Sequence, residues 1–257
     1  MIQTAFLLPF AVQQPPQPFL SQKQPLALTV RCASSASEQD VGAVLRTVRL
    51  WTQFANTGGL AGSRINPAEA ELHVSATSPP ANPHCHFGLS ECYVDDRAYV
   101  VLVEMLLRGP AASLIEAVEL SRRFGEPLLS LTCGAKTSTY PATYAHHPFA
   151  LTDQRPESGA YTVVLEMAQP LLDDNRNTLE SALMIWTQVV LAGGFALAPN
   201  SPSDNYVEPD HQLTVFDLTV EWSMFKLQAD PASIGALLNV LTCFSLSRQR
   251  ISSVTIQ

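Results

Sequence analysis

The sequence predicts an α+β protein that consists of two tandem ferredoxin-like (βαββαβ) sandwich units related by internal duplication. First, residues 26–62 align with residues 161–197 without a gap, and the alignment keeps both identities and apolar positions. Second, strand-like and helix-like apolar segments follow one another in the order βαββαβ twice. Third, 257 residues, 46% of them hydrophobic and 15% charged, are enough for two domains with cores of their own.

The repeated phrase Trp-Thr-Gln and a glycine pair that follows it are the most specific part of the alignment. The identical positions are Trp51, Thr52, Gln53, Gly58, Gly59 and Ala61 in the first copy and Trp186, Thr187, Gln188, Gly193, Gly194 and Ala196 in the second. A tryptophan on the apolar face of a helix usually anchors a core. We therefore expect both tryptophans to pack structurally; in the alternative interpretation, the paired Trp and Gln residues line a cleft that the two units share.

In the first copy, residues 26–32 predict a strand and residues 41–54 a helix with one apolar stripe. Ser37 and Asp40 are suited to the amino end of this helix, and Gly58 to its carboxyl end. The remaining elements expected in this copy are strands at 70–77 and 99–106, a helix at 111–124 and a closing strand at 128–133.

In the second copy, residues 160–167 predict the first strand, and Asp174 or Asn175 is expected to cap the helix that follows. The later elements are expected as strands at 212–220 and 221–228, a helix at 231–246 and a strand at 251–256. The two sheets could pair edge to edge or pack face to face, as in dimeric α+β barrels, and the sequence leaves both arrangements open.

Proline-rich stretches set the expected domain boundaries. Residues 1–24 are predicted to form an extended arm, and residues 135–158 a linker. The first unit then spans residues 25–134 and the second residues 159–257.

Composition points to a cytoplasmic protein. No apolar run is long enough to cross a bilayer, and no basic residue precedes Lys23, so neither a membrane span nor export is expected. Five cysteines without a regular framework suggest reduced thiols. The net charge of −8 disfavours nucleic acid and anionic membranes as partners and favours a basic patch on a protein.

One cluster contains metal-binding side chains. His84, Cys85 and His86 follow one another, with Cys92, Asp95 and Asp96 close behind. Imidazole and thiolate are ligands for zinc or copper, but this alternation is not a usual zinc spacing. An exposed polar loop is the favoured interpretation, and no cofactor is expected.

Other signals of catalysis are weak. His146 and His147 could supply a general base, but neighbouring histidines in a loop do not easily face one target. There is no Gly-x-Ser-x-Gly motif. The glycine pairs follow helices, whereas a phosphate-binding loop precedes one.

These observations favour a non-enzymatic, protein-binding module of the cytoplasm, with the general character of an acidic bacterial inhibitor or immunity-type protein that neutralises a partner. The acidic residues expected at the contact are Asp95, Asp96, Asp173, Asp174, Asp204 and Asp210. The alternative is a dimeric α+β-barrel-like enzyme, or a binder of haem or another small molecule, with a cavity between the units. Nucleic-acid recognition is disfavoured, because the chain has no long basic cluster.

Overall fold

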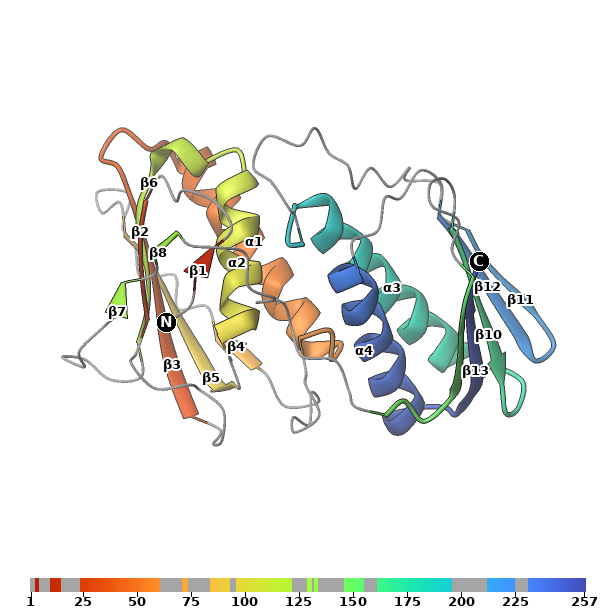
Figure 1. Ribbon diagram of the computed structural model, residues 1–257. Coiled ribbons are helices and arrows are strands. Elements are labelled where there is room, and N and C mark those ends of the chain that lie inside the picture. Colours follow the sequence, from red (N-terminus) through yellow and green to blue (C-terminus); the bar gives the residue numbers. More distant parts are fainter. Residues whose placement is uncertain are drawn as a thin grey trace.

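The computed structural model describes residues 3–4, 10–14, 24–60, 71–73, 84–92, 96–121, 129–130, 132–133, 146–154, 161–195, 212–224 and 231–257. In this part of the chain the fold is mixed α+β, with four helices between two sheets (Figure 1). One sheet and its helices belong to residues before 134, which we call the first half. The other sheet and its helices belong to residues from 146 onward, the second half.

The sheet of the first half has six strands. From one edge to the other they are β4 (Glu71–His73), β5 (His84–Cys92), β3 (Gln24–Cys32), β6 (Ile115–Ser121), β2 (Ala11–Gln14) and β7 (Leu129–Ser130). β3 is antiparallel to both β5 and β6, and β2 runs parallel to β6. A separate parallel pair joins β1 (Gln3–Thr4) to β8 (Thr132–Cys133).

The sheet of the second half has five strands. Their order is β11 (Gln212–Phe216), β12 (Thr219–Met224), β10 (Tyr161–Met167), β13 (Ile251–Ile256) and β9 (Ala150–Asp153). β10 is antiparallel to β12 and β13, and β9 runs parallel to β13. The predicted arm thus contributes β1 and β2, and the predicted linker contributes β9, so strands from both segments extend the sheets.

The two sheets correspond closely in register. Val30 of β3 pairs with Val118 of β6, and Leu165 of β10 pairs with Val254 of β13. The pairing shifts by one residue between Arg31 and Cys32 in the first half, and at the matching place, between Glu166 and Met167, in the second. β6 and β13 also share one alternation of buried and exposed residues over their first six positions.

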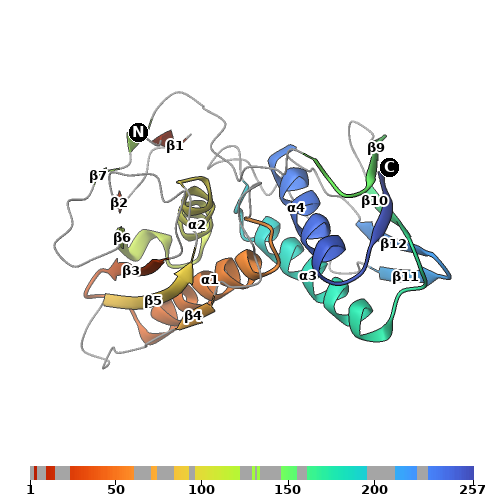
Figure 2. The same ribbon diagram turned by 90° about the horizontal axis from the view of Figure 1, so that it is seen from below.

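The four helices fill the space between the sheets (Figure 2). α1 (Glu38–Asn56) and α2 (Asp96–Arg108) cover the first sheet, whereas α3 (Asp173–Leu191) and α4 (Pro231–Ser247) cover the second. α1 also contacts α3, so that the layers are sheet, helices, helices and sheet. No helix in the described part of the chain combines the length and the hydrophobicity needed to span a bilayer.

Local signals define both ends of α1, as predicted. The Ser37 hydroxyl accepts a hydrogen bond from the Asp40 amide, and the Asp40 carboxylate accepts one from the Ser37 amide at 2.9 Å, which forms a capping box. At the other end Gly58 has a φ of 85°, and the Gly59 amide donates to the Phe54 carbonyl. This turn satisfies carbonyls that the helix leaves unpaired.

The amino end of α3 differs from the prediction. Leu172 precedes the helix, and neither Asp174 nor Asn175 caps it with its side chain. Instead, the buried Gln249 accepts hydrogen bonds from the Leu172 amide and the Asn175 side chain at 3.2 and 3.0 Å. A residue distant in sequence satisfies the helix end, and local patterns carry no signal of such a contact.

Two elements of the first half were predicted wrongly. Residues 99–106 form most of α2 and not a strand, because this run, apolar apart from Glu104, is buried on all sides between the first sheet and the second half. Residues 111–124 contain a short 3-10 turn (Ala112–Leu114) and β6, not a helix. Apolar runs of this length fit either element, and tertiary contacts decide between them.

The remaining differences follow from these two. The expected loop around His84 is the strand β5, and β6 closes the first sheet in place of residues 128–133, which form β7 and β8. The expected strand at 70–77 is described only as β4. The strand-turn-strand segment 212–224 turns at Asp217, whose φ is 48°. The predicted helix at 231–246 and strand at 251–256 are confirmed.

Contacts between the halves are mainly apolar, with a few buried polar atoms. The rings of Phe54 and Phe195 meet edge to face, with centroids 6.0 Å apart. The Asn239 side chain of α4 donates a hydrogen bond to the Gly59 carbonyl of the first half at 3.2 Å. In the reverse direction, the Arg108 side chain of α2 lies over Gly193. Each half therefore places a helix against the glycine turn of the other.

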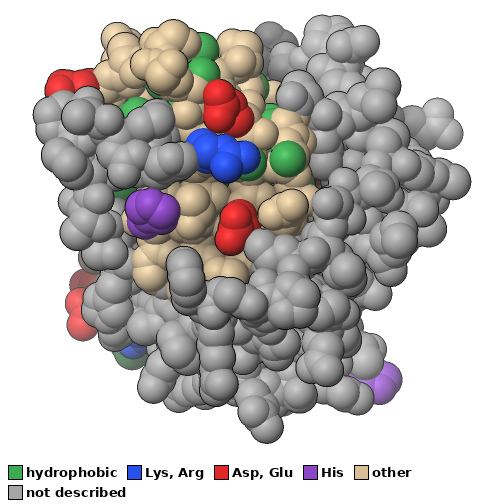
Figure 3. Space-filling model, turned by 90° about the vertical axis from the view of Figure 1, so that its left-hand side faces the viewer, with side chains coloured by type: hydrophobic (Ala, Val, Ile, Leu, Met, Phe, Trp, Pro, Cys, Tyr) green, Lys and Arg blue, Asp and Glu red, His purple; other side chains and the backbone are tan. Residues whose placement is uncertain are grey.

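The described patch on the outer face of the first sheet carries polar and charged side chains (Figure 3). Arg31 and Glu116, both about half exposed, form an ion pair there at 3.5 Å. His86 is exposed on the same sheet, and its ring hydrogen-bonds to the Thr29 hydroxyl at 3.2 Å.

Candidate functional site

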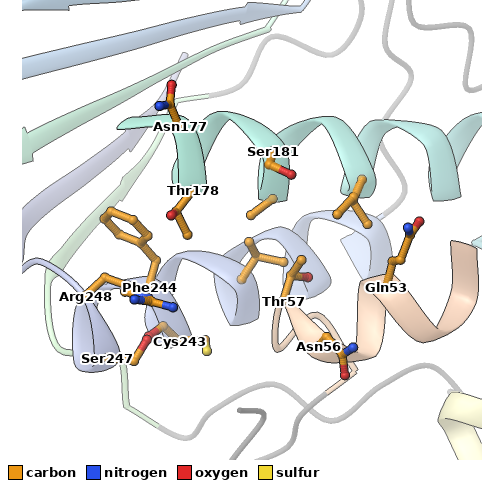
Figure 4. Close-up of a pocket in the computed structure, with 13 residues that line it drawn as sticks. Gln53, Asn56, Thr57, Asn177, Thr178, Ser181, Cys243, Phe244, Ser247 and Arg248 are labelled. Carbon is orange, nitrogen blue, oxygen red and sulfur yellow. The ribbon is translucent and has the colours of Figure 1, made fainter. Parts of the chain in front are cut away.

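A hollow lined by described residues lies where the two halves meet (Figure 4). It has a volume of about 870 Å³ and adjoins a smaller hollow of about 440 Å³. The two share Gln53, Asn177, Ser181 and Ile185, and we call them together the inter-helix groove. The larger hollow is lined by Gln53, Asn56, Thr57, Asn177, Thr178, Ser181, Ala182, Ile185, Val240, Cys243, Phe244, Ser247 and Arg248.

Three helix segments position these side chains. The last turn of α1 supplies Gln53 and Asn56, and its cap residue Thr57 donates a hydrogen bond from its hydroxyl to the Phe54 carbonyl at 2.8 Å. α3 supplies residues at intervals of three and four, such as Asn177 and Ser181, which place them on one face of the helix. α4 and the residue after it supply the remaining wall.

The carboxyl end of α4 lines the groove, and the corresponding helix of the first half is shorter. α2, the corresponding helix of the first half, ends at Arg108, before Gly109 and Pro110. Proline cannot continue a helix, and the residue before it avoids helical geometry. α4 has no such break and continues through Ser247. This extra turn brings Phe244, Ser247 and Arg248 to the groove.

The lining combines uncharged hydrogen-bonding groups with apolar surface. Amides and hydroxyls alternate with apolar groups, and Arg248 is the one charged residue of the larger hollow. Glu180 lines the smaller hollow. Figure 4 shows Arg248 and Ser247 at one end of the larger hollow and Gln53 at the other.

Cys243 is the nucleophilic side chain in the groove. Burial raises the pKa of its thiol, against the opposing effects of a hydrogen bond with Ser247 and the positive charge of Arg248. No histidine or carboxylate is among the residues that line the larger hollow with it. A thiol with a raised pKa and no neighbouring base is a poor nucleophile near neutral pH.

The tryptophans of the repeated Trp-Thr-Gln phrase lie in the core, and its glutamines lie in the groove. The Trp51 indole donates to the Ala98 carbonyl at 2.9 Å, and the Trp186 indole donates to the Ser233 carbonyl at 2.8 Å. Both tryptophans are buried, in agreement with the packing interpretation. Gln53 and Gln188 are exposed, and both line the smaller hollow. The glutamines, and not the tryptophans, therefore lie in a groove between the halves.

The predicted metal cluster is divided between the faces of β5. Cys85 is buried and its neighbour His86 is exposed, because successive residues of a strand point to opposite faces. A hydrogen bond joins the Cys85 thiol to that of Cys32; together with burial it raises the pKa of Cys85. His84 lies in the same strand. Within the described ranges, no three His, Cys, Asp or Glu residues lie close enough to hold a metal ion.

The two neighbouring histidines also separate. His146 is exposed, whereas the half-buried His147 stacks on Phe149, with ring centroids 5.2 Å apart, and hydrogen-bonds to the Thr242 hydroxyl at 2.8 Å. Burial lowers the pKa of His147. This histidine fixes the segment before β9 against α4 and does not line the groove.

The predicted acidic contact residues are only partly described. Asp173 and Asp174 are exposed in the first turn of α3, and Asp96 begins α2. Asp95, Asp204 and Asp210 lie outside the described residues. Sequence reasoning missed Asn177, Ser181, Ser247 and Arg248, because no local motif marks them and tertiary packing brings them together.

Comparison with known proteins finds only distant structural similarity. No protein-family model and no curated protein matches the chain. Two solved structures are distantly similar: an oxyferrous complex of DtpA from Streptomyces lividans, and a DyP-type peroxidase from Streptomyces coelicolor. Each is 14% identical, with 94% of this chain and 90% of the other covered, and the TM-scores are 0.24 and 0.22. Likenesses as low as these support no conclusion about fold or function, and the chain's function has to be inferred from its own residues.

Proposed function

We infer that the two halves are ferredoxin-like units that arose by internal duplication. Their matching strand orders, their shared register shift and the equivalent bonds of Trp51 and Trp186 support this inference. The order β6-β3-β5-β4 reappears as β13-β10-β12-β11, in which the first strand of each βαββαβ segment lies between the last and the third. Duplication also accounts for the two glycine turns that the halves place against each other's helices.

We propose that the chain is a non-enzymatic binding protein that docks an extended segment of a partner protein in the inter-helix groove. The observation that carries this proposal is the groove itself, which is open, runs across three helices and is lined by amides and hydroxyls with apolar residues between them. Such groups pair with the backbone amides and carbonyls of a peptide, and apolar residues between them receive its side chains. The weak activation of Cys243 favours binding over catalysis.

The net charge of −8 fits this proposal at long range, since it attracts a partner of positive net charge. The exposed Asp173 and Asp174 add to that field. A cytoplasmic inhibitor or immunity-type role is a narrower form of the proposal, and it requires that the partner lose its activity in the complex.

The test is selection of a displayed library of short random peptides on the full chain. Peptides retained by the wild type should be lost with Ser181→Trp, which places a large ring in the groove. The same peptides should be retained by Ser252→Trp, which adds the same side chain at an exposed position of β13 that does not line the groove. Peptides that bind Ser181→Trp as well as they bind the wild type, or a failure to enrich any peptide, would overturn the proposal.

A small-molecule binder is the second candidate. The volume of about 870 Å³ favours it, because ligand pockets commonly measure roughly 300–1,000 Å³. Thermal stabilisation of the wild type, but not of Ser181→Trp, by members of a metabolite library would support this candidate in place of the first.

A further inference from the structure

The charges within the inter-helix groove are unevenly distributed. Among the thirteen residues that line the larger hollow, Arg248 is the only cation, and none is a carboxylate. The one acidic residue of the groove, Glu180, lines the smaller hollow. The end of the groove at Arg248 is therefore positive, although the chain as a whole is strongly negative.

The Arg248 side chain is available to a ligand. It is exposed, and it makes no ion pair with any carboxylate in the described part of the chain. Its backbone amide donates to the Phe244 carbonyl at 2.9 Å, which fixes the residue at the end of α4. A guanidinium presents five donors in a planar fork that matches the two oxygens of a carboxylate.

The surroundings of Arg248 limit what accompanies that carboxylate. Phe244 and Val240 provide apolar surface on the same helix, and Thr178 provides a neutral hydroxyl on the facing helix α3. Dense negative charge is disfavoured, because Asp173 and Asp174 lie in the first turn of α3, one turn before Asn177. A ligand with one carboxylate beside uncharged residues suits this site better than an acidic tract.

On the basis of the proposed function, we infer that the docked segment carries a single glutamate or aspartate side chain that Arg248 binds. The contact gives the segment its register, since Arg248 is the one point of positive charge in a lining of neutral groups. Partners with the matching sequence but a glutamine at this place lose the charge-assisted bond and keep the remaining contacts.

The experiment compares two immobilised libraries of capped peptides, random except for one fixed central residue, which is glutamate in one library and glutamine in the other. Each library is probed with the full chain as the wild type, Arg248→Gln and Arg250→Gln. Arg250 is also exposed, lies two residues further along and does not line the groove, so its variant controls for the loss of one positive charge. The wild type and Arg250→Gln should retain peptides of the glutamate library about tenfold better, and Arg248→Gln should show no preference.

Two results would overturn this inference. One is equal retention of both libraries by the wild type, and the other is a glutamate preference that survives Arg248→Gln. In either case, loss of peptide binding in Ser181→Trp would still support the groove as a docking site, so the two proposals fail separately. Binding of free acetate or succinate without any retained peptide would assign the site to small carboxylates and would also count against the inference.

Discussion

Residues at corresponding positions of the two halves make equivalent hydrogen bonds. Trp51 and Trp186 each donate one indole hydrogen bond to a carbonyl in the first turn of the neighbouring helix. Thr52 and Thr187 each bond to the carbonyl four residues earlier. These bonds satisfy polar atoms that would otherwise be costly to bury. The repeated phrase is therefore explained by packing, except for its glutamines, which face the groove.

Gly193 gives a prediction at this scale. Its φ is 78°, and a Cβ atom at this position would lie 2.1 Å from Cδ of Arg108. Gly193→Ala should lower the free energy of unfolding by about 1–3 kcal/mol, because alanine is strained at positive φ and displaces Arg108. Urea denaturation measures the change.

Gly42→Ala is the matched control for that substitution. Gly42 lies within α1, and an added Cβ would make only an ordinary contact with Arg46. We expect it to raise stability by up to about 1 kcal/mol, because alanine favours the helix. A loss of stability with Gly42→Ala as large as that with Gly193→Ala would contradict the explanation.

At the scale of elements, helix length determines where the groove forms. α2 has 13 residues and α4 has 17, and the additional residues of α4 include Phe244 and Ser247. Gly109 and Pro110 end the shorter helix. The two halves thus differ in the length of this helix, and Gly109 and Pro110 set the difference. The longer helix, α4, provides a wall of the candidate site.

The start of α1 gives a prediction that depends on pH. Hydrogen bonds from the Ser37 side chain and amide lower the pKa of Asp40. Because the folded-state pKa lies below the unfolded one, the carboxylate stabilises the fold above the unfolded pKa, and this contribution is lost as the pH falls through the folded one. Asp40→Asn should lower the urea midpoint at pH 6, and the difference from the wild type should shrink below about pH 4.

Glu38→Gln serves as the control, since it removes a charge from the same first turn without breaking the capping box. Its effect at pH 6 should be smaller than that of Asp40→Asn. If the two variants behave alike across this pH range, the capping box does not stabilise α1 as inferred.

At the scale of the whole molecule, the helices join the two halves. Phe54 meets Phe195, Asn239 bonds to Gly59, and Arg108 covers Gly193. In both directions a helix of one half lies against the glycine turn of the other. The sheets lie outermost and the four helices lie between them (Figure 1).

Phe195→Ala tests the contact between the two halves. Phe195 is fully buried against the other half, and its truncation should cost about 3–5 kcal/mol in the free energy of unfolding. Phe216→Ala, at a position that is 59% exposed, should change stability by less than about 0.5 kcal/mol. Calorimetry should show one transition for the wild type and for Phe216→Ala. Equal melting of all three proteins would mean that this contact does not hold the halves together.

The sequence by itself determined the elements whose signals are local. The strand at 26–32, the capped helix after it, the glycine turns, the helix at 231–246 and the final strand all follow from periodicity, capping residues and glycine geometry. These signals act between residues a few positions apart, so they can be identified before any tertiary contact is known.

Only the tertiary structure decided the rest. The apolar run of α2 fits a strand as well as a helix, and it became a helix because it is packed on one side by a sheet and on the other by the second half. The groove likewise brings together Gln53, Asn177 and Arg248, which no spacing in the sequence relates. Long-range packing fixes both outcomes, since burial on several faces and convergence of distant side chains arise only when the two halves meet.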